Sequence, residues 1–126
     1  MSNIINTENA PKAIGPYSQA VVVGSFVFTS GQIPLCPVSG EMVGCNITEQ
    51  TEQVCKNLKA VLEASGSGFK SVIKTTCFLQ NMEDFAAFNE VYSKYFVSKP
   101  ARSCVAVKTL PKNSLVEIEA VAEIIK

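Results

Sequence analysis

The chain contains no histidine among its 126 residues. This absence removes the general base that enzymes use most often, and it rules out His-based metal sites. The chain also has no net charge, because eleven basic residues balance eleven acidic ones. No segment concentrates Lys or Arg. Proteins that hold nucleic acid usually present a strongly basic surface, so we expect no nucleic-acid partner.

Long apolar runs and targeting signals are absent as well. The first residues, MSNIINTENAPKAIGPYS, lack the basic and then apolar pattern of a secretory signal and the Arg-rich character of a transit peptide. No apolar run approaches the roughly 20 residues that cross a bilayer. These features predict a cytoplasmic protein without a membrane partner.

The cysteines show neither a disulfide framework nor the spacing of a metal site. They are odd in number, lie nine or more residues apart and form no CxxC pair. Without histidine, a zinc site would need four distant cysteines, so we expect free thiols and no metal. Cys55 and Cys77 fall on predicted apolar faces and are expected in the core.

Length and composition predict one domain over residues 1–126. Hydrophobic residues make up 47% of the chain and charged residues 17%, which is typical of a compact domain with its own core. No linker or repeat interrupts the pattern.

Several segments have the composition of β-strands. Residues 17–30 contain two apolar runs around Gly24-Ser25, which predicts an N-terminal hairpin. Residues 70–80 predict a central strand, and residues 101–109 and 115–124 predict two closing strands joined by the turn LPKNS. The Pro- and Gly-punctuated segment at 35–46 is expected to be an irregular loop.

Two segments have helical periodicity. The first helix is predicted over 48–65, with Asn46 or Thr48 as its cap and Gly66 as its stop. The second is predicted over 82–96, with Asn81 as its cap, an aromatic stripe and a stop at Lys99-Pro100. Asn89 falls inside that stripe and is expected on the buried face.

The predicted order ββαβαββ indicates an α+β sandwich in which two helices cover one face of a mixed sheet. The last strand has a wholly apolar side, and its other side carries acidic and apolar residues. The sheet face without helices is therefore partly apolar. A homo-oligomer would cover it.

Arg102 and Cys104 point to the same side of their predicted strand. An arginine at a strand end is often a surface ion-pair partner, but this one is followed by small and apolar residues. Its planar fork then favours a planar anion, and we expect a carboxylate ligand. Cys104 has no histidine to activate it as a nucleophile. We expect it to line a pocket and to offer its backbone N–H.

Glu117 or Glu119 is the obvious protein carboxylate to pair with Arg102. If the two closing strands pair symmetrically about their turn, Arg102 and Glu117 lie about five residues apart, or roughly 16 Å. Both serve one pocket only if different subunits supply them, or if a bulge shifts the register. Tyr17, Ser30 and Gly31 lie at ends of the hairpin strands, where they either border a cleft or form turns.

Four segments, NAPKAIGPYSQA (9–20), TSGQIP (29–34), PARSCVAV (100–107) and LPKNSLVEIEAVA (110–122), closely resemble the RidA or YjgF family of reactive intermediate deaminases. The match runs in order over essentially the whole chain. PARSCV followed downstream by EIEA is its most specific part.

The resemblance implies a chorismate-mutase-like α+β fold and a homotrimer with a cleft at each subunit interface. It implies hydrolysis of enamine and imine intermediates, such as 2-aminoacrylate and 2-iminopropanoate, to 2-keto acids and ammonia without a cofactor. Arg102 would then hold the substrate carboxylate, and Glu117 would position or activate water. Tyr17, Ser30, Gly31, Asn89 and Cys104 would line the pocket.

Two other functions compete with the deaminase. One is a non-catalytic regulatory trimer that binds keto acids or related metabolites in the same intersubunit pocket. Glu117 favours the enzyme, because a carboxylate sensor needs Arg102 but no acid or base. The other is RNA cleavage or translation inhibition, which the balanced charge and the missing histidine disfavour.

Overall fold

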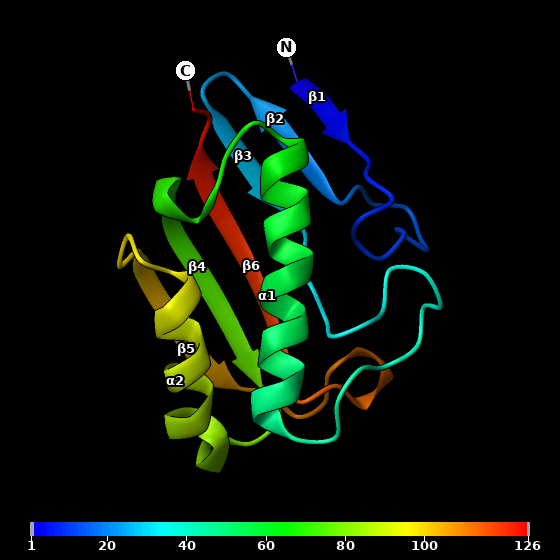
Figure 1. Cartoon of the computed structure of the whole chain (residues 1–126), viewed down its shortest axis with the longest axis vertical. Coiled ribbons are helices and arrows are strands. Elements are labelled where there is room, and N and C mark those ends of the chain that lie inside the picture. The colour runs from blue at the N-terminus through cyan, green and yellow to red at the C-terminus, as the bar shows by residue number, and fades with distance from the viewer. Residues whose placement is uncertain (1, 126) are drawn as a thin grey trace.

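The computed structural model describes residues 2–125. Six strands form one sheet in the order β1-β2-β3-β6-β4-β5, and all neighbours are antiparallel except β4 and β5. Figure 1 shows both helices in front of this sheet, which confirms the α+β class with the helices on one face. The elements are β1 (Ser2–Ile5), β2 (Ala20–Val23), β3 (Phe26–Thr29), α1 (Ile47–Ala64), β4 (Val72–Leu79), α2 (Phe85–Tyr95), β5 (Ala101–Ala106) and β6 (Val116–Glu123).

The N-terminal hairpin forms where it was predicted. Val23 pairs with Phe26, which leaves Gly24 and Ser25 as a two-residue turn, and Gly24 adopts a φ of 58° that glycine accepts without strain. The sequence did not predict β1, which pairs with the outer edge of β2 and makes the order βββαβαββ. Four residues without clear alternation give little strand signal, and the edge of β2 supplies the partner.

The predicted pairing of the two closing strands is wrong. β4 lies between them: it pairs in parallel with β5 and antiparallel with β6. Helix α2 carries the chain from β4 to β5, as a crossover between parallel strands requires. β6 takes an inner position because Val116, Ile118, Ala120 and Ala122 are all buried on its helix side.

Helix α1 begins at its predicted cap, whereas the predicted cap of α2 precedes a short turn and not the helix itself. The Asn46 side chain accepts a hydrogen bond from the Glu49 N–H at 2.9 Å, and α1 ends before Gly66, whose φ is 83°. Asn81 caps a short 3₁₀ turn over Met82–Asp84, so α2 itself begins three residues later than predicted.

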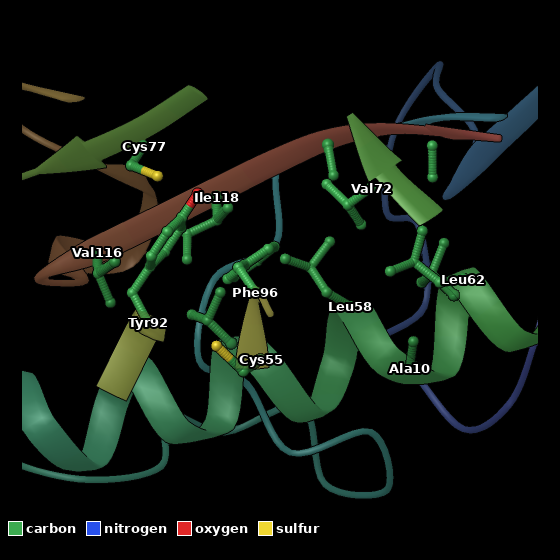
Figure 2. Close-up of a cluster of buried hydrophobic side chains, with 14 of the residues drawn as sticks. Ala10, Cys55, Leu58, Leu62, Val72, Cys77, Tyr92, Phe96, Val116 and Ile118 are labelled. Carbon is green, nitrogen blue, oxygen red and sulfur yellow. The ribbon is translucent and has the colours of Figure 1, made fainter. Parts of the chain in front are cut away.

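The core lies between the helices and the sheet. Figure 2 shows Leu58 and Leu62 of α1 facing Val72 of β4 and Ile118 of β6. Cys55 and Cys77 are fully buried in this cluster, as predicted, and burial raises the pKa of the Cys77 thiol to about 12. In residues 2–125 neither helix is long and apolar enough to cross a bilayer.

The other face of the sheet, which we call the open face, carries large apolar side chains that are not covered by helices. Phe26 and Phe28 of β3 are 40% and 49% exposed, and Val105 of β5 is 47% exposed. Phe28 pairs with Val121 of β6, so the exposed groups continue across neighbouring strands. An apolar surface spread over several strands is typical of a face that another chain covers.

Candidate active site

Four of the predicted site residues line one cavity of about 420 Å³. Tyr17 comes from the segment before β2, Ser30 and Gly31 follow β3, and Glu117 belongs to β6. β3 and β6 are neighbours in the sheet, so their ends meet here. The remaining lining residues are Pro11, Lys12, Ile14, Gln19, Gln32, Ile33, Leu35, Pro111 and Lys112.

Glu117 and Gly31 lie against each other in this cavity. A Cβ atom placed on Gly31 would come within 1.9 Å of Glu117 Oε2, so only glycine leaves room for the carboxyl group. Burial, and next the nearby Glu119, raise the pKa of Glu117 above its usual value. The acid is thus held in a partly dry cavity, where it exchanges a proton more readily near neutral pH than an exposed glutamate does.

Replacing Gly31 with alanine is expected to displace the Glu117 carboxyl group while the fold persists. The atoms that the new Cβ meets belong to the far end of a flexible side chain, so the side chain moves rather than the backbone. We expect turnover to fall roughly 10²-fold. Gly68→Ala is the control, because its Cβ would meet only Ile125 Cδ1 at 4.0 Å. Unchanged turnover in Gly31→Ala would contradict this role of Gly31.

Arg102 lies away from this cavity, among the aromatic side chains of α2. Its guanidinium carbon is 4.8 Å from the centre of the Tyr92 ring and 5.4 Å from that of Phe85. Its Nη1 donates a hydrogen bond of 2.7 Å to Asn89 Oδ1, an amide oxygen. The side-chain amide of Asn89 therefore holds one edge of the fork, but it carries no charge that would balance the charge of the guanidinium.

One chain does not bring Arg102 and Glu117 together. On β4, Thr75 is the partner of Arg102 and Phe78 is the partner of Glu117, so the two side chains lie on opposite faces of the sheet. β4 separates the strands of Arg102 and Glu117, and Thr75 and Phe78 are three positions apart along β4. The backbones of Arg102 and Glu117 are therefore roughly 14 Å apart. The large separation inferred from sequence is correct, although the hairpin used to infer it does not exist.

A second hollow, of about 550 Å³, contains the Arg102 group. Asn89, Tyr92 and Arg102 line it together with residues from the end of α2 to the start of β5. The sequence-predicted site therefore divides into two parts, one around Glu117 and one around Arg102. The first part has the acid Glu117 together with Lys12 and Lys112, and the second has Arg102 together with Lys99.

The sequence is similar to that of a known protein family. The profile of the family described as Endoribonuclease L-PSP matches residues 7–124, which is nearly the whole chain. Both parts of the site fall within the match. The chain belongs to the RidA/YjgF family.

Relatives in this family are similar to nearly the whole of this chain. RutC family protein PH0854 of Pyrococcus horikoshii is 56% identical over 97% of this chain and 98% of its own. The chloroplastic Reactive Intermediate Deaminase A of Arabidopsis thaliana is 47% identical over 94% of this chain and 64% of its own. The crystal structure of Escherichia coli TdcF with bound serine has a TM-score of 0.91 and 46% identity, covering 96% of this chain and 98% of TdcF.

Cys104, the remaining predicted residue of the RidA/YjgF signature PARSCV, lies on the same side of β5 as Arg102 and is half-buried. Burial raises the pKa of its thiol, and the charge of Arg102 only partly offsets this. The thiol is therefore mostly protonated at neutral pH, which disfavours it as a nucleophile. Its role in lining a pocket stays a prediction.

Sequence reasoning missed several residues that line the Glu117 cavity. Ile14, Ile33 and Leu35 supply apolar wall, and Gln19 is a polar residue that is only 2% exposed. Among these missed residues, only Gln19 has a signal in the sequence, because it is a glutamine just before the apolar run of β2. Nothing in the sequence indicates which backbone groups it binds.

Proposed function

We propose that this protein hydrolyses enamine and imine intermediates, of the 2-aminoacrylate and 2-iminopropanoate type, to 2-keto acids and ammonia. Arg102 holds the substrate carboxylate through two hydrogen bonds, and Glu117 positions or activates the attacking water. The observation that carries the proposal is the Glu117 carboxyl group, half-buried with a raised pKa and pressed against Gly31 inside a cavity.

The chemistry needs little more than these groups. The oxygen of water bonds to the imine carbon while Glu117 takes a proton from that water; the electron pair of the C=N double bond moves to nitrogen, which receives the proton from Glu117 to give a carbinolamine. Glu117 then takes the hydroxyl proton of the carbinolamine and passes it to the amine nitrogen, so that the C=O bond forms as the carbon–nitrogen bond breaks, ammonia leaves and the keto acid remains. An enamine first tautomerises to the imine. Because an imine is already electrophilic, orientation and one acid–base group suffice, and the absence of histidine is no obstacle.

The proposed site combines two chains. Arg102 and Glu117 lie on opposite faces of one sheet, so Arg102 of one subunit must meet Glu117 of another. The apolar open face gives the chains a reason to associate, and we propose a homotrimer with a site at each interface. Light scattering should then give three times the 13.5 kDa mass of the chain, whereas a monomer would contradict the shared site.

The names of relatives support the proposal. One relative is called a reactive intermediate deaminase, and TdcF was crystallised with serine, an amino acid whose carboxylate lies next to its amine carbon. A site for a 2-imino acid needs to recognise the same arrangement. Ribonuclease activity is disfavoured for this chain, although the family is described as Endoribonuclease L-PSP, because its basic and acidic residues balance and it has no histidine.

The proposal is tested by generating an imine in place with an amino-acid oxidase and following release of keto acid and ammonia. The protein should accelerate this release above the rate without it. If the rate is unchanged with several amino acids while keto acids still bind, the protein is a metabolite-binding module. That alternative is favoured by the aromatic and amide setting of Arg102, which can bind a carboxylate without Glu117.

The pH dependence of turnover should report Glu117. The ionised carboxylate is the base, so activity falls as pH drops through its pKa. Because burial raises that pKa, the acidic limb is expected above the usual range of a glutamate, which is about 4.3 in free peptides. The measurement is kcat/KM against pH for the wild type and for Glu117→Gln, whose residual activity should lack this limb. An acidic limb of the wild-type profile at the ordinary pKa of glutamate would contradict the buried setting of Glu117.

A further inference from the structure

Gln19 binds the backbone of the segment that enters the Glu117 cavity. Its Oε1 accepts a hydrogen bond from the Thr7 N–H at 2.7 Å. Its Nε2 lies 3.0 Å from the Thr7 carbonyl oxygen, 2.9 Å from that of Pro11 and 3.4 Å from that of Ala10. Figure 1 shows this segment, between β1 and β2, beside the start of β2. One buried side chain thus fixes three places along a loop without regular structure.

The same residue is connected to the opposite side of the cavity. The Gln19 carbonyl oxygen accepts a hydrogen bond of 2.9 Å from the Ser30 N–H. Gly31, which lies against Glu117, follows directly. Gln19 therefore joins the loop at residues 7–11 to the end of β3, and its own side chain lines the cavity between them.

The loop leads into a wall, residues 11–17, most of which is exposed. Pro11, Lys12, Ile14 and Tyr17 all line the cavity, yet Ile14 is 72% exposed and Tyr17 is 52% exposed. Within this segment the Tyr17 N–H donates to the Gly15 carbonyl at 2.8 Å, and the Tyr17 hydroxyl lies 3.4 Å from Ile14 N. These are local bonds. They shape the turn but do not attach it to the sheet.

We propose that Gln19 is a positioning residue for substrate binding: it attaches the wall formed by residues 11–17 to the sheet, so that Tyr17 faces the cavity that contains Glu117. This inference rests on the proposed function and adds a residue that sets KM. Glutamine suits the place because its amide accepts from an N–H and donates to carbonyl groups at once. Glutamate has no donor when ionised, and methionine has neither group.

The first experiment compares steady-state kinetics of Gln19→Met with those of the wild type. Loss of the hydrogen bonds frees the wall, and we expect KM to rise about tenfold while kcat changes much less. Ser67→Ala is the control: its hydroxyl is also buried and donates to the Glu123 carbonyl at 2.6 Å, at the other end of β6 from Glu117. It should lower the melting temperature without raising KM. Equal changes of KM in both variants would overturn the proposal.

The second experiment uses Gln19→Glu, which retains the size of the side chain. When ionised, its carboxylate faces carbonyl oxygens; when protonated, its O–H again donates to one of them. The ratio of its KM to the wild-type KM should therefore fall as pH is lowered. Dividing by the wild type at each pH removes the titration of Glu117. A ratio that does not depend on pH would contradict the hydrogen-bonding role.

The third experiment needs no turnover, so it remains informative if the proposed function fails. Amide hydrogen exchange of Gln19→Met should be faster than that of the wild type in residues 7–17 and unchanged in α1 and β6. Exchange that is unchanged in residues 7–17 would overturn the positioning role even in an active enzyme. Faster exchange in a protein without deaminase activity would retain the role of Gln19 and reject only the substrate.

Discussion

Replacing Arg102 with alanine is expected to lower kcat/KM for imine hydrolysis by roughly 10²- to 10³-fold, because the substrate carboxylate loses a desolvated charge and two hydrogen bonds. The structure supports this size of effect. The guanidinium is packed against Tyr92 and Phe85 and is held by Asn89, so its position is determined before a ligand arrives. A preorganised group contributes more than one that must first be ordered.

Arg102→Lys separates charge from shape. Lysine retains the positive charge but not the planar fork, so we expect most of the loss to remain. Arg102→Met retains part of the packing against the aromatic rings, and its melting temperature controls for loss of the contacts with α2. Keto-acid affinity, measured by calorimetry, should fall in parallel with kcat/KM. If Arg102→Ala retained wild-type kcat/KM, Arg102 would not be the carboxylate clamp.

Replacing Glu117 with glutamine is expected to lower kcat by about 10²- to 10³-fold and to change keto-acid affinity little, since acid–base groups contribute on this scale. Glutamine has nearly the same size, so it fits beside Gly31, but it cannot take a proton from water. Glu119→Gln is the matched control. It lies on the same strand and the same side of the sheet, but it is exposed and does not line the cavity. It should retain most of the activity.

The Glu117→Gln variant should also differ in stability, in a direction that depends on pH. Burial raises the pKa of Glu117 in the folded chain, so the folded chain holds this proton more tightly than the unfolded chain does. The resulting stabilisation is present below the unfolded pKa and is lost as pH rises through the folded pKa. Glutamine does not titrate. The melting temperature of Glu117→Gln minus that of the wild type should therefore be more positive at neutral pH than in acid. A difference that is more positive in acid would contradict a raised pKa.

The local elements were predictable because each has its own signal. Gly24-Ser25 marks the hairpin turn, Asn46 caps α1, and Asn81 caps the 3₁₀ turn that precedes α2. The apolar side of the last strand correctly indicated a strand with one buried face. Such signals lie within a few residues of the element that they specify.

The order of the strands was not predictable in the same way. Adjacent closing strands usually pair as a hairpin, yet β4 inserts between β5 and β6 because α2 returns the chain in parallel beside β4. This arrangement depends on contacts across the whole sheet. It also places Arg102 and Glu117 on opposite faces, a stronger reason for a site shared between chains than distance along a strand.

The sequence indicated candidate site residues but not the contacts that support them. Arg102 and Glu117 stood out because each combines a charge with an apolar neighbourhood, and the family resemblance assigned their roles. The side chains that hold them are less visible. Asn89 meets Arg102 from another element, and Gln19 binds backbone groups 8–12 residues away. A hydrogen bond to a backbone group can be made by almost any residue, so the partner cannot be recognised from its residue type in the sequence.

The central claim is that Arg102 of one subunit and Glu117 of another form each site. It is tested most directly by mixing two inactive variants, Arg102→Ala and Glu117→Gln, and reassembling them together under conditions that exchange subunits. If the site is shared, some interfaces unite an intact Arg102 with an intact Glu117. Random assembly of equal amounts should then restore roughly a quarter of wild-type deaminase activity. Activity no greater than the mean of the two separate variants, with exchange shown by mass spectrometry, would contradict the account.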